Sequence, residues 1–163
     1  MTSCPGKSSE SSFGRHWQRD LQRDLDSISS WGARAVVTLI ELHEFHQLNV
    51  HGLRQGVLDR GMDWLHLPVV DRASPDLRFE NAWMTAGPRL HRLLRDGCRF
   101  VVHSRGGLGR TGTVVARLLV ERGETPVVAI RLVRSARAGA IETQQQERYI
   151  QRQKSLPPMC LCA

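Results

Sequence analysis

The chain has 163 residues, of which 40% are hydrophobic, and its formal net charge is +7. This length suits one domain with a substantial core. The sequence has no apolar run of about 18 residues and no basic stretch followed by an apolar one at its start, so we expect neither a membrane-spanning nor a secreted protein. We expect a cytoplasmic protein with no stable membrane association.

The positive charge is almost all arginine, and the arginines are scattered along the chain. Such a surface favours anions in general and does not decide the partner, and we expect no nucleic-acid partner. Four cysteines are present, and their spacing suits neither a zinc site nor a disulfide framework: Cys4, Cys98, Cys160 and Cys162. This pattern predicts a reducing compartment and no metal or other cofactor.

The amino-terminal part divides into two predicted segments. Residues 1–14 are rich in Ser and Gly and are predicted to be a disordered leader. Apolar side chains then recur at helical spacing from Trp17 through Leu21 and Leu25 to Ile28. This spacing predicts a first amphipathic helix.

A β-branched apolar run at residues 35–40 is typical of a buried strand. Short helices are predicted at residues 41–48 and 53–60, and a second strand at residues 63–67. A loop at residues 68–76 follows this strand. The first half of the chain therefore alternates between strands and helices.

A long helix is predicted at residues 76–95, with Asp76 as its N-cap. Pro88 lies inside this helix and is expected to kink or split it. A third strand, at residues 99–103, leads into a glycine-rich turn.

Further helices are predicted after this turn, at residues 111–122, 126–138 and 143–153. Alternating strands and helices predict an α/β fold, a single-domain sandwich with a central, mainly parallel sheet flanked by helices. We expect the domain to cover residues 15–153 and to end in a flexible tail at residues 154–163.

The turn between strand and helix has the pattern of an anion-binding loop. Glycines at three of four successive positions let the backbone curl so that N–H groups point inward. Such a nest holds an anion, and the following helix adds its positive end. Arg110 can offer a planar fork to two phosphate oxygens. The residues expected to bind phosphate are Arg105, Gly106, Gly107, Leu108, Gly109 and Arg110.

The motif from His103 to Thr111 resembles the His-Cys-x5-Arg-Ser/Thr signature of cysteine-based protein tyrosine and dual-specificity phosphatases. Its Gly-Gly-Leu-Gly-Arg form is similar to the kinase-associated phosphatase branch of that family. Further segments are similar to this branch in order and spacing: residues 35–41, 66–71 and 140–143. The resemblance covers about residues 15–152 and implies the protein tyrosine phosphatase fold.

In that family a cysteine thiolate attacks phosphorus, an aspartate protonates the leaving oxygen, and water hydrolyses the phosphoenzyme. The resemblance places Ser104 at the nucleophile position and Arg110 on the phosphate. It implies Asp71 as the general acid, with Asp76 as a rival that better suits helix capping. Thr111 would assist the departing sulfur in the second step.

The resemblance also implies supporting roles. His103 would orient the loop and tune the nucleophile. Glu142 and Gln146 match positions that help to place the hydrolytic water in tyrosine-specific relatives. Glu142 would repel a phosphate dianion unless it were paired with an arginine, and its alternative role is a carboxylate at the start of the helix that follows Thr143. Arg105 could add positive potential at the mouth of the site or face solvent.

A serine at the nucleophile position changes the predicted activity. A hydroxyl has a far higher pKa than a thiol, and the motif supplies no general base for it. We therefore expect a monomer that binds phosphate, sulfate and phosphorylated proteins or peptides with negligible turnover. A laboratory Cys→Ser change and a natural pseudophosphatase both explain Ser104, and the retained Asp71, Arg110 and Thr111 favour the first.

Functions of other classes stay open. A phosphoprotein-binding module without turnover would use the same loop, and Ser104 is the feature in its favour. A phosphoinositide or RNA-end phosphatase would share the fold, with Arg105 as its only extra basic loop residue.

Overall fold

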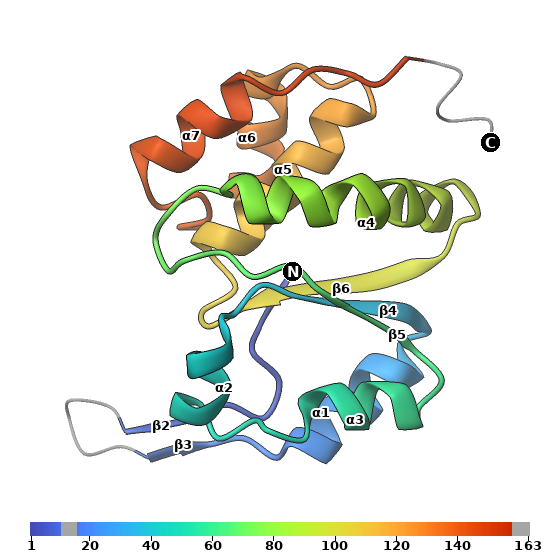
Figure 1. The fold of residues 1–163 in the computed structure, drawn as a ribbon, viewed down its shortest axis with the longest axis vertical. Coiled ribbons are helices and arrows are strands. Elements are labelled where there is room, and N and C mark those ends of the chain that lie inside the picture. Colours follow the sequence, from blue (N-terminus) through green and yellow to red (C-terminus); the bar gives the residue numbers. More distant parts are fainter. Residues whose placement is uncertain (11–15, 158–163) are drawn as a thin grey trace.

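The computed structural model describes residues 1–10 and 16–157 of the chain. A parallel sheet forms its centre, with helices on both sides (Figure 1). The strands lie in the spatial order β1 (Thr2–Ser3), β6 (Arg99–Ser104), β4 (Ala33–Thr38) and β5 (Asp63–His66). Each neighbouring pair in this sheet runs parallel, which confirms the predicted α/β class.

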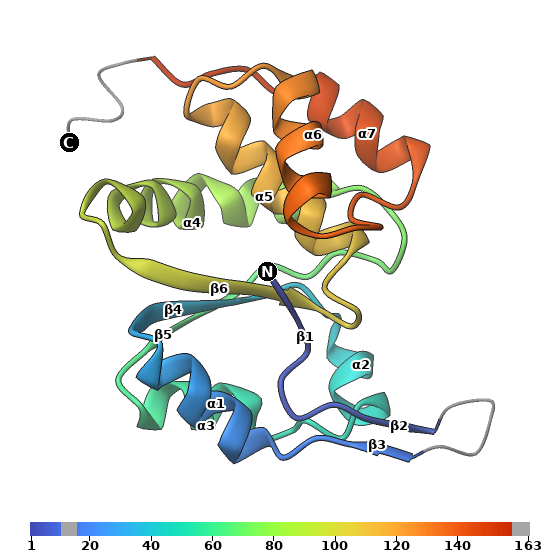
Figure 2. The ribbon, with the colours of Figure 1, turned by 180° about the vertical axis from the view of Figure 1, so that it is seen from behind.

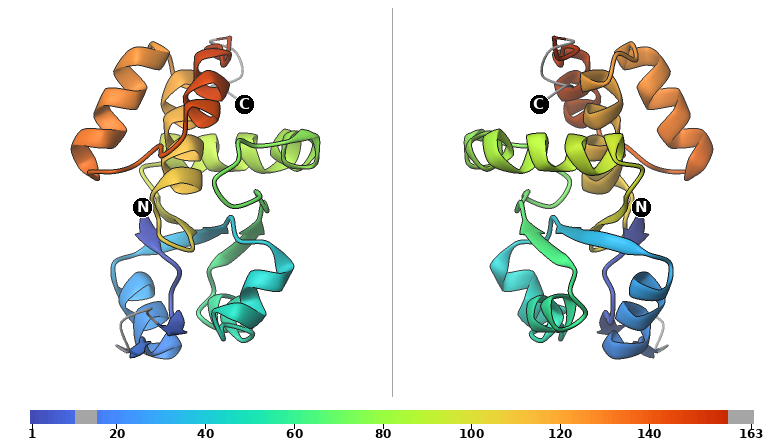
Figure 3. Two further views of the ribbon diagram at one scale, coloured as in Figure 1. Left: turned by 90° about the vertical axis from the view of Figure 1, so that its left-hand side faces the viewer. Right: turned by 90° about the vertical axis from the view of Figure 1, so that its right-hand side faces the viewer.

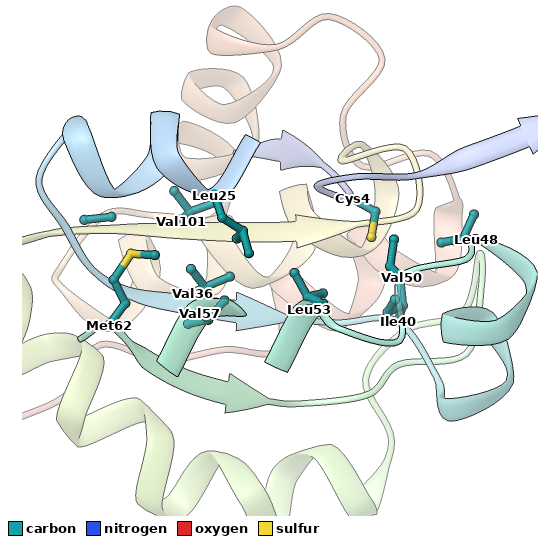
Figure 4. Close-up of a cluster of buried hydrophobic side chains, with 11 residues drawn as sticks. Cys4, Leu25, Val36, Ile40, Leu48, Val50, Leu53, Val57, Met62 and Val101 are labelled. Carbon is teal, nitrogen blue, oxygen red and sulfur yellow. The ribbon is translucent and has the colours of Figure 1, made fainter. Parts of the chain in front are cut away.

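One side of the sheet carries three helices (Figure 2): α1 (Leu21–Ser30), α2 (Leu42–Gln47) and α3 (Leu53–Asp59). The core between them and the strands includes the fully buried Leu25, Val36 and Leu53 (Figure 4). The other side carries α4 (Leu77–Arg95), α5 (Gly109–Glu121), α6 (Pro126–Ala136) and α7 (Gln144–Gln151). Figure 3 shows the sheet between these two layers.

Helix α5 contributes to both buried clusters of the second layer. One buried cluster, with Phe79 and Val102, joins the sheet to α4 and α5. Another cluster, with Val120, Ile130 and Ile150, joins α5 to α6 and α7. The loop that leads into α5 is therefore held by packed elements behind it. None of the helices in the described ranges is long and apolar enough to cross a membrane.

Most predicted elements are present, with ends shifted by a few residues. Helix α1 begins later than predicted because the Asp20 carboxylate accepts two backbone N–H groups of the first turn and caps the helix there. Trp17 instead belongs to β3 (His16–Gln18), which pairs antiparallel with β2 (Ser8–Glu10).

Helix α4 tolerates its internal proline. Asp76 caps the helix as predicted, accepting the N–H of Phe79 at 3.1 Å. The helix then runs without a break through Pro88, so the proline does not split it. The carbonyl of Met84, one turn earlier, loses its helical partner, but Met84 is 78% exposed and water can bond that carbonyl.

The amino-terminal segment is ordered where its composition predicts a disordered leader. Strand β1 pairs with the end of β6, with Ser3 opposite Ser104, and Cys4 is fully buried in the core. The prediction was wrong here because pairing with an open strand edge uses only backbone groups, which composition does not reveal. Residues 11–15, which include the end of the predicted leader, lie outside the described residues.

The predicted tail is described only in part. Residues 154–157 follow α7, and Leu156 donates its N–H to the carbonyl of Glu121 at 3.0 Å. Leu156 thereby packs this part of the chain beside the end of α5. Residues 158–163 lie outside the described part of the chain, so a flexible tail there stays a prediction.

Candidate active site

The carboxyl ends of the parallel strands meet at one edge of the sheet, where ligands of α/β folds bind. A pocket of about 340 Å³ opens at the end of β6, and it is lined by Lys7, Asp71, Arg72, Ser104, Arg105, Gly106, Leu108, Arg110 and Glu142. The structure thus brings the predicted nucleophile, phosphate arginine, general acid and one water-positioning residue together. Within residues 1–10 and 16–157, no group of three or more His, Cys, Asp or Glu side chains could hold a metal ion.

Ser104 lies at the floor of this pocket, and its side chain is a hydrogen-bond acceptor there. The hydroxyl oxygen accepts the N–H of Gly107 at 3.2 Å and the hydroxyl of Thr111 at 3.0 Å. Together with the N-terminus of α5, these donors favour negative charge on the atom. The geometry would stabilise a thiolate at position 104.

His103 lies beneath the loop and is fully buried. Its Nε2 is 2.8 Å from the hydroxyl oxygen of Thr38, which also accepts the indole N–H of Trp64 at 2.9 Å. Burial lowers the pKa of His103 to about 3, so the imidazole is neutral at physiological pH. The contact with Thr38 ties the end of β6, where the loop begins, to the end of β4. Its predicted role in orienting the loop stays a prediction.

Arg110 is held by a carboxylate that sequence analysis missed. Its terminal nitrogens donate to the two oxygens of Glu44 at 2.6 and 2.9 Å, and one also donates to the carbonyl of Val69 at 3.1 Å. Glu44 lies on α2 and accepts the N–H of Glu41 at 2.9 Å. This bidentate pair fixes the plane of the guanidinium group.

Opposing effects set the charges of Glu44 and Arg110. Burial alone would raise the pKa of Glu44, but hydrogen bonds from Arg110 and from the backbone of Glu41 outweigh it, so the pKa is lowered. Burial also acts to lower the pKa of Arg110, and the contacts with Glu44 more than offset it. Both groups are therefore charged at neutral pH. The sequence offered one clue to the role of Glu44. It is an acidic residue on a short helix directly after a parallel strand, and such helices begin at the ligand-binding edge of the sheet.

Asp71 lies on the loop between β5 and α4, with its carboxylate 2.9 Å from the guanidinium of Arg110. The next two carbonyls of this loop accept hydrogen bonds from Thr143 at 3.2 Å and from Gln146 at 3.1 Å. The loop is therefore anchored, while the Asp71 side chain stays 53% exposed and free to turn toward a ligand. Asp76, the rival acid, does not line the pocket.

The residues predicted to place water differ in their access to the pocket. Glu142 lines the pocket, and its carboxylate accepts the N–H of Gly109 at 2.8 Å. Gln146 is fully buried, and its amide bonds the backbone N–H of Glu142 at 2.9 Å and the carbonyl of Ala73. Glu142 thus contacts the start of α5 and not that of α7, before which it stands, so its alternative role at the start of α7 stays a prediction. Gln146 braces the acid loop. Water placement by either residue stays a prediction.

Two glycines of the loop are required for different reasons. Gly107 is buried with φ at +71°, and a Cβ there would collide with the carbonyl of Thr2. A Cβ at Gly109 would collide with the carboxylate of Glu142. Gly106, by contrast, has open space around it. The close approach of Thr2 shows that the amino-terminal segment supports the loop from outside.

Lys7 also lines the pocket and was not predicted from the sequence. Its ammonium group donates to the carbonyl of Arg105 at 3.4 Å. A turn at Gly6, where φ is +68°, brings Lys7 to this position. The two residues are 98 positions apart, so no local pattern reveals the contact.

A family model decides the identity of this fold and pocket. The model for the phosphatase domain of the Swiss Army Knife proteins, described as a DSP-PTPase domain, matches residues 17–150. The chain belongs to this DSP-PTPase family. The pocket is therefore that of a chain from a family of hydrolases, which act on phosphoric monoesters.

Similar proteins support the same assignment. Cyclin-dependent kinase inhibitor 3 from Rattus norvegicus and from Homo sapiens is 29% identical over 136 residues, which cover 82% of this chain and 63% of each relative. The chain thus spans less than two thirds of the length of these relatives.

Solved structures extend the comparison. Kinase associated phosphatase with its catalytic cysteine substituted by serine matches with a TM-score of 0.80 and 26% identity, over 91% of this chain and 80% of that one. Tk-PTP in its active form matches with a TM-score of 0.67 and 30% identity, over 83% and 87% of the two chains. These findings confirm the resemblance to kinase-associated phosphatases and the protein tyrosine phosphatase fold.

Proposed function

We propose that this DSP-PTPase domain is a protein phosphatase whose activity depends on residue 104. With cysteine there, it hydrolyses phosphotyrosine, phosphoserine or phosphothreonine through a phosphocysteine intermediate. With Ser104, it binds such substrates with negligible turnover. The supporting observation is the convergence of the Gly107 N–H and the Thr111 hydroxyl on the side chain of residue 104, in a pocket that also holds Arg110.

Phosphate binding uses the loop amides and one side of the Arg110 fork. The amides and the N-terminus of α5 favour a tetrahedral dianion. Glu44 is buried and holds Arg110 through two hydrogen bonds, whereas Asp71 is exposed and contacts it at one point. An incoming phosphate would therefore displace Asp71 and keep Glu44 in place. The released carboxyl group could then approach the leaving oxygen.

In the cysteine form, each group has a defined step. The thiolate attacks phosphorus while Asp71 gives its proton to the leaving oxygen. Water then attacks the phosphocysteine, and the hydroxyl of Thr111 hydrogen-bonds the departing sulfur. Arg110 holds the equatorial oxygens through both transition states.

Ser104 lacks a base that would make it a nucleophile. Thr111 and Gly107 donate to its oxygen, and neither contact removes a proton. His103 is neutral, but a pKa of about 3 makes it a weak base, and its ring bonds Thr38 instead. The hydroxyl therefore stays protonated at neutral pH, which supports binding without turnover.

Restoring the sulfur tests the proposal. The Ser104→Cys variant should hydrolyse para-nitrophenyl phosphate at least about 1,000-fold faster than the serine chain, because loss of a nucleophile in an assembled site costs that much or more. The Ser104→Ala variant is the matched control and should be as inactive as the serine chain. A cysteine variant that stays inactive but still binds phosphopeptides would reject the enzyme and favour the phosphoprotein-binding module.

A further inference from the structure

The carboxylate of Glu142 holds one of the backbone donors of the phosphate loop. It lines the pocket and accepts the N–H of Gly109 at 2.8 Å. Gly109 is the first residue of α5, so this N–H has no partner within the helix and is free to bind an anion. Gly109 is also among the residues that the sequence predicts to bind phosphate. A side chain of the protein therefore uses a donor that a phosphate oxygen is expected to use.

The space beside Gly109 is shaped for this carboxylate. A Cβ at Gly109 would collide with the carboxylate of Glu142 and with the side-chain amide of Gln146. The φ of Gly109 does not lie in the left-handed region, so its backbone conformation would accept other residues. The close approach of Glu142, and not the backbone, is what requires glycine at this position.

The backbone that leads into Glu142 is strained and firmly held. Ile141 has a φ of +60°, which a β-branched residue rarely adopts. This residue is 2% exposed, and its carbonyl accepts a hydrogen bond from Arg134 at 2.9 Å. The side-chain carbonyl of Gln146 accepts the N–H of Glu142 at 2.9 Å. Such strain persists only where surrounding contacts impose it, and it is concentrated at functional segments.

The charged groups that face Glu142 come from several other segments. They are Asp71 and Arg72 of the acid loop, Arg105 and Arg110 of the phosphate loop, Lys7 of the amino-terminal segment, and Arg134 of α6. Within residues 1–10 and 16–157, none of them forms an ion pair with Glu142. Arg110 pairs with Glu44 and Asp71, and Arg134 pairs with Glu147. The negative charge of Glu142 is therefore balanced by the start of α5 and by no single cation.

A phosphate in the loop would compete with this carboxylate. The two anions cannot both accept the N–H of Gly109, and like charges a few ångströms apart repel each other. A proton on Glu142 removes the conflict, because a neutral carboxyl group has an O–H that can donate to an oxygen of the bound anion. Protonation thus changes Glu142 from a competitor of the phosphate into one of its hydrogen-bond donors.

We propose that Glu142 is an internal competitor for the phosphate site, so that a doubly negative oxyanion binds together with one proton, which Glu142 takes up. The inference rests on the proposed function, because it requires the loop at Ser104 to bind phosphate. When Glu142 loses the proton again, it returns to the N–H of Gly109 and favours release of the anion. In the cysteine form, the anion released in this way is the product phosphate.

Sulfate binding by the serine chain tests the inference, because sulfate stays a dianion at mildly acidic and neutral pH. Isothermal titration calorimetry at constant ionic strength would compare about pH 5 with about pH 7.5. We expect about tenfold tighter binding at the lower pH, since an anion that binds with a proton binds more strongly as protons become available. Repeating the titrations in buffers of different ionisation enthalpy counts the protons taken up.

The Glu142→Gln variant should bind sulfate about tenfold more tightly than the parent serine chain at about pH 7.5. It should take up fewer protons and lose most of the pH dependence. The dependence that remains belongs to Asp71, which the anion also displaces from Arg110. Glu124→Gln, the same charge change at an exposed position beyond the end of α5, is the matched control and should bind like the parent.

The pH profile separates competition from a structural role. Because Glu142 also bonds the start of α5, its loss could simply weaken the loop. Glu142→Gln would then bind sulfate more weakly at both pH values with an unchanged pH dependence, which would overturn the inference. Tighter binding with the same pH dependence and proton uptake as the parent would overturn it as well.

The remaining outcomes separate the two proposals. Equal sulfate binding by the parent and by Glu142→Gln at both pH values would overturn the internal competitor and leave the proposed function intact. Failure of both chains to bind sulfate at either pH would contradict the proposed function, and the internal competitor with it.

Discussion

Two regions meet at the pocket, and local sequence patterns predict the structure of only one of them. The strand, loop and helix from residue 99 to residue 121 carry a β-branched run, spaced glycines and a helix, all of which are local patterns. The amino-terminal residues 1–8 look like a polar leader, yet they add a strand to the sheet and bury Cys4. The motif of the loop indicates the chemistry of the site, but no local sequence pattern predicts that residues 1–8 support this loop.

The two regions are mechanically joined. The carbonyl of Thr2 lies against Gly107, and the carbonyl of Arg105 accepts hydrogen bonds from the N–H of Cys4 and from Lys7, both at 3.4 Å. The anion-binding loop is thus bound from its outer side by residues that lie about a hundred positions away in sequence. Variants in each region separate their contributions.

The largest effect is expected within the motif itself. In the Ser104→Cys background, Arg110→Lys should lower kcat/KM by about 1,000-fold, because an ammonium group cannot hold Glu44 and two phosphate oxygens at once. Steady-state kinetics with para-nitrophenyl phosphate would measure it. A loss of less than tenfold would show that the guanidinium fork is not what binds phosphate.

The next largest effect is expected on stability, at the position where the two regions meet. Gly107→Ala should lower the free energy of unfolding by about 3 kcal/mol, because the new Cβ meets the carbonyl of Thr2 in a backbone region that favours glycine. Gly106→Ala, one position earlier and with open space around it, should change stability by less than about 0.5 kcal/mol. Urea unfolding would measure both, and equal effects would contradict the contact with Thr2.

Cysteine substitutions test whether the amino-terminal segment is ordered. Cys4→Ser should cost about 2 kcal/mol of unfolding free energy, because a hydroxyl would replace a fully buried thiol. Cys98→Ser, at a half-buried position, should cost less than about 0.5 kcal/mol. Burial also raises the pKa of Cys4 to about 12, so alkylation at mildly basic pH should spare it. A disordered leader would show no loss of stability and rapid alkylation of Cys4.

The smallest effect concerns pH. The pKa of His103 is about 3 in the folded chain, below its usual 6.5, so the unfolded chain takes up the proton first as the pH falls. Stability is therefore full above about pH 6.5 and declines toward pH 3, with a loss of about 1 kcal/mol at pH 5.5 from this group. Urea unfolding at pH 6.5 and at pH 5.5 should show a smaller loss of unfolding free energy for His103→Gln than for the parent chain. The exposed His51→Gln is the control and should leave the loss unchanged.

The predictable parts of the site are those whose partners are close in sequence or fixed by the motif. Ser104, Arg110 and Thr111 belong to one strand, loop and helix, and the resemblance to a known family supplied Asp71. Glu44 could not be assigned because its partner Arg110 is 66 positions away, and an acid on a short helix has many other uses.

The fold shows the same limit. A buried β-branched run predicted the strand at residues 35–40, since burial on both faces leaves a continuous apolar pattern. The strand predicted at residues 63–67 is also present, although its residues are half-buried and none is β-branched. Strand β1 has no such pattern, because its two residues contribute backbone hydrogen bonds and little side-chain burial. Trp17 fitted the helical period but lies before Asp20, whose capping contacts begin the helix.

Diffusion of tungstate into crystals of the serine chain tests the oxyanion cradle most directly. We expect an oxyanion bonded by the loop amides and by Arg110, with Glu44 still hydrogen-bonded to the guanidinium and Asp71 released. An empty loop at saturating tungstate, or an Arg110 that remains with Asp71 and turns away from the ion, would contradict it.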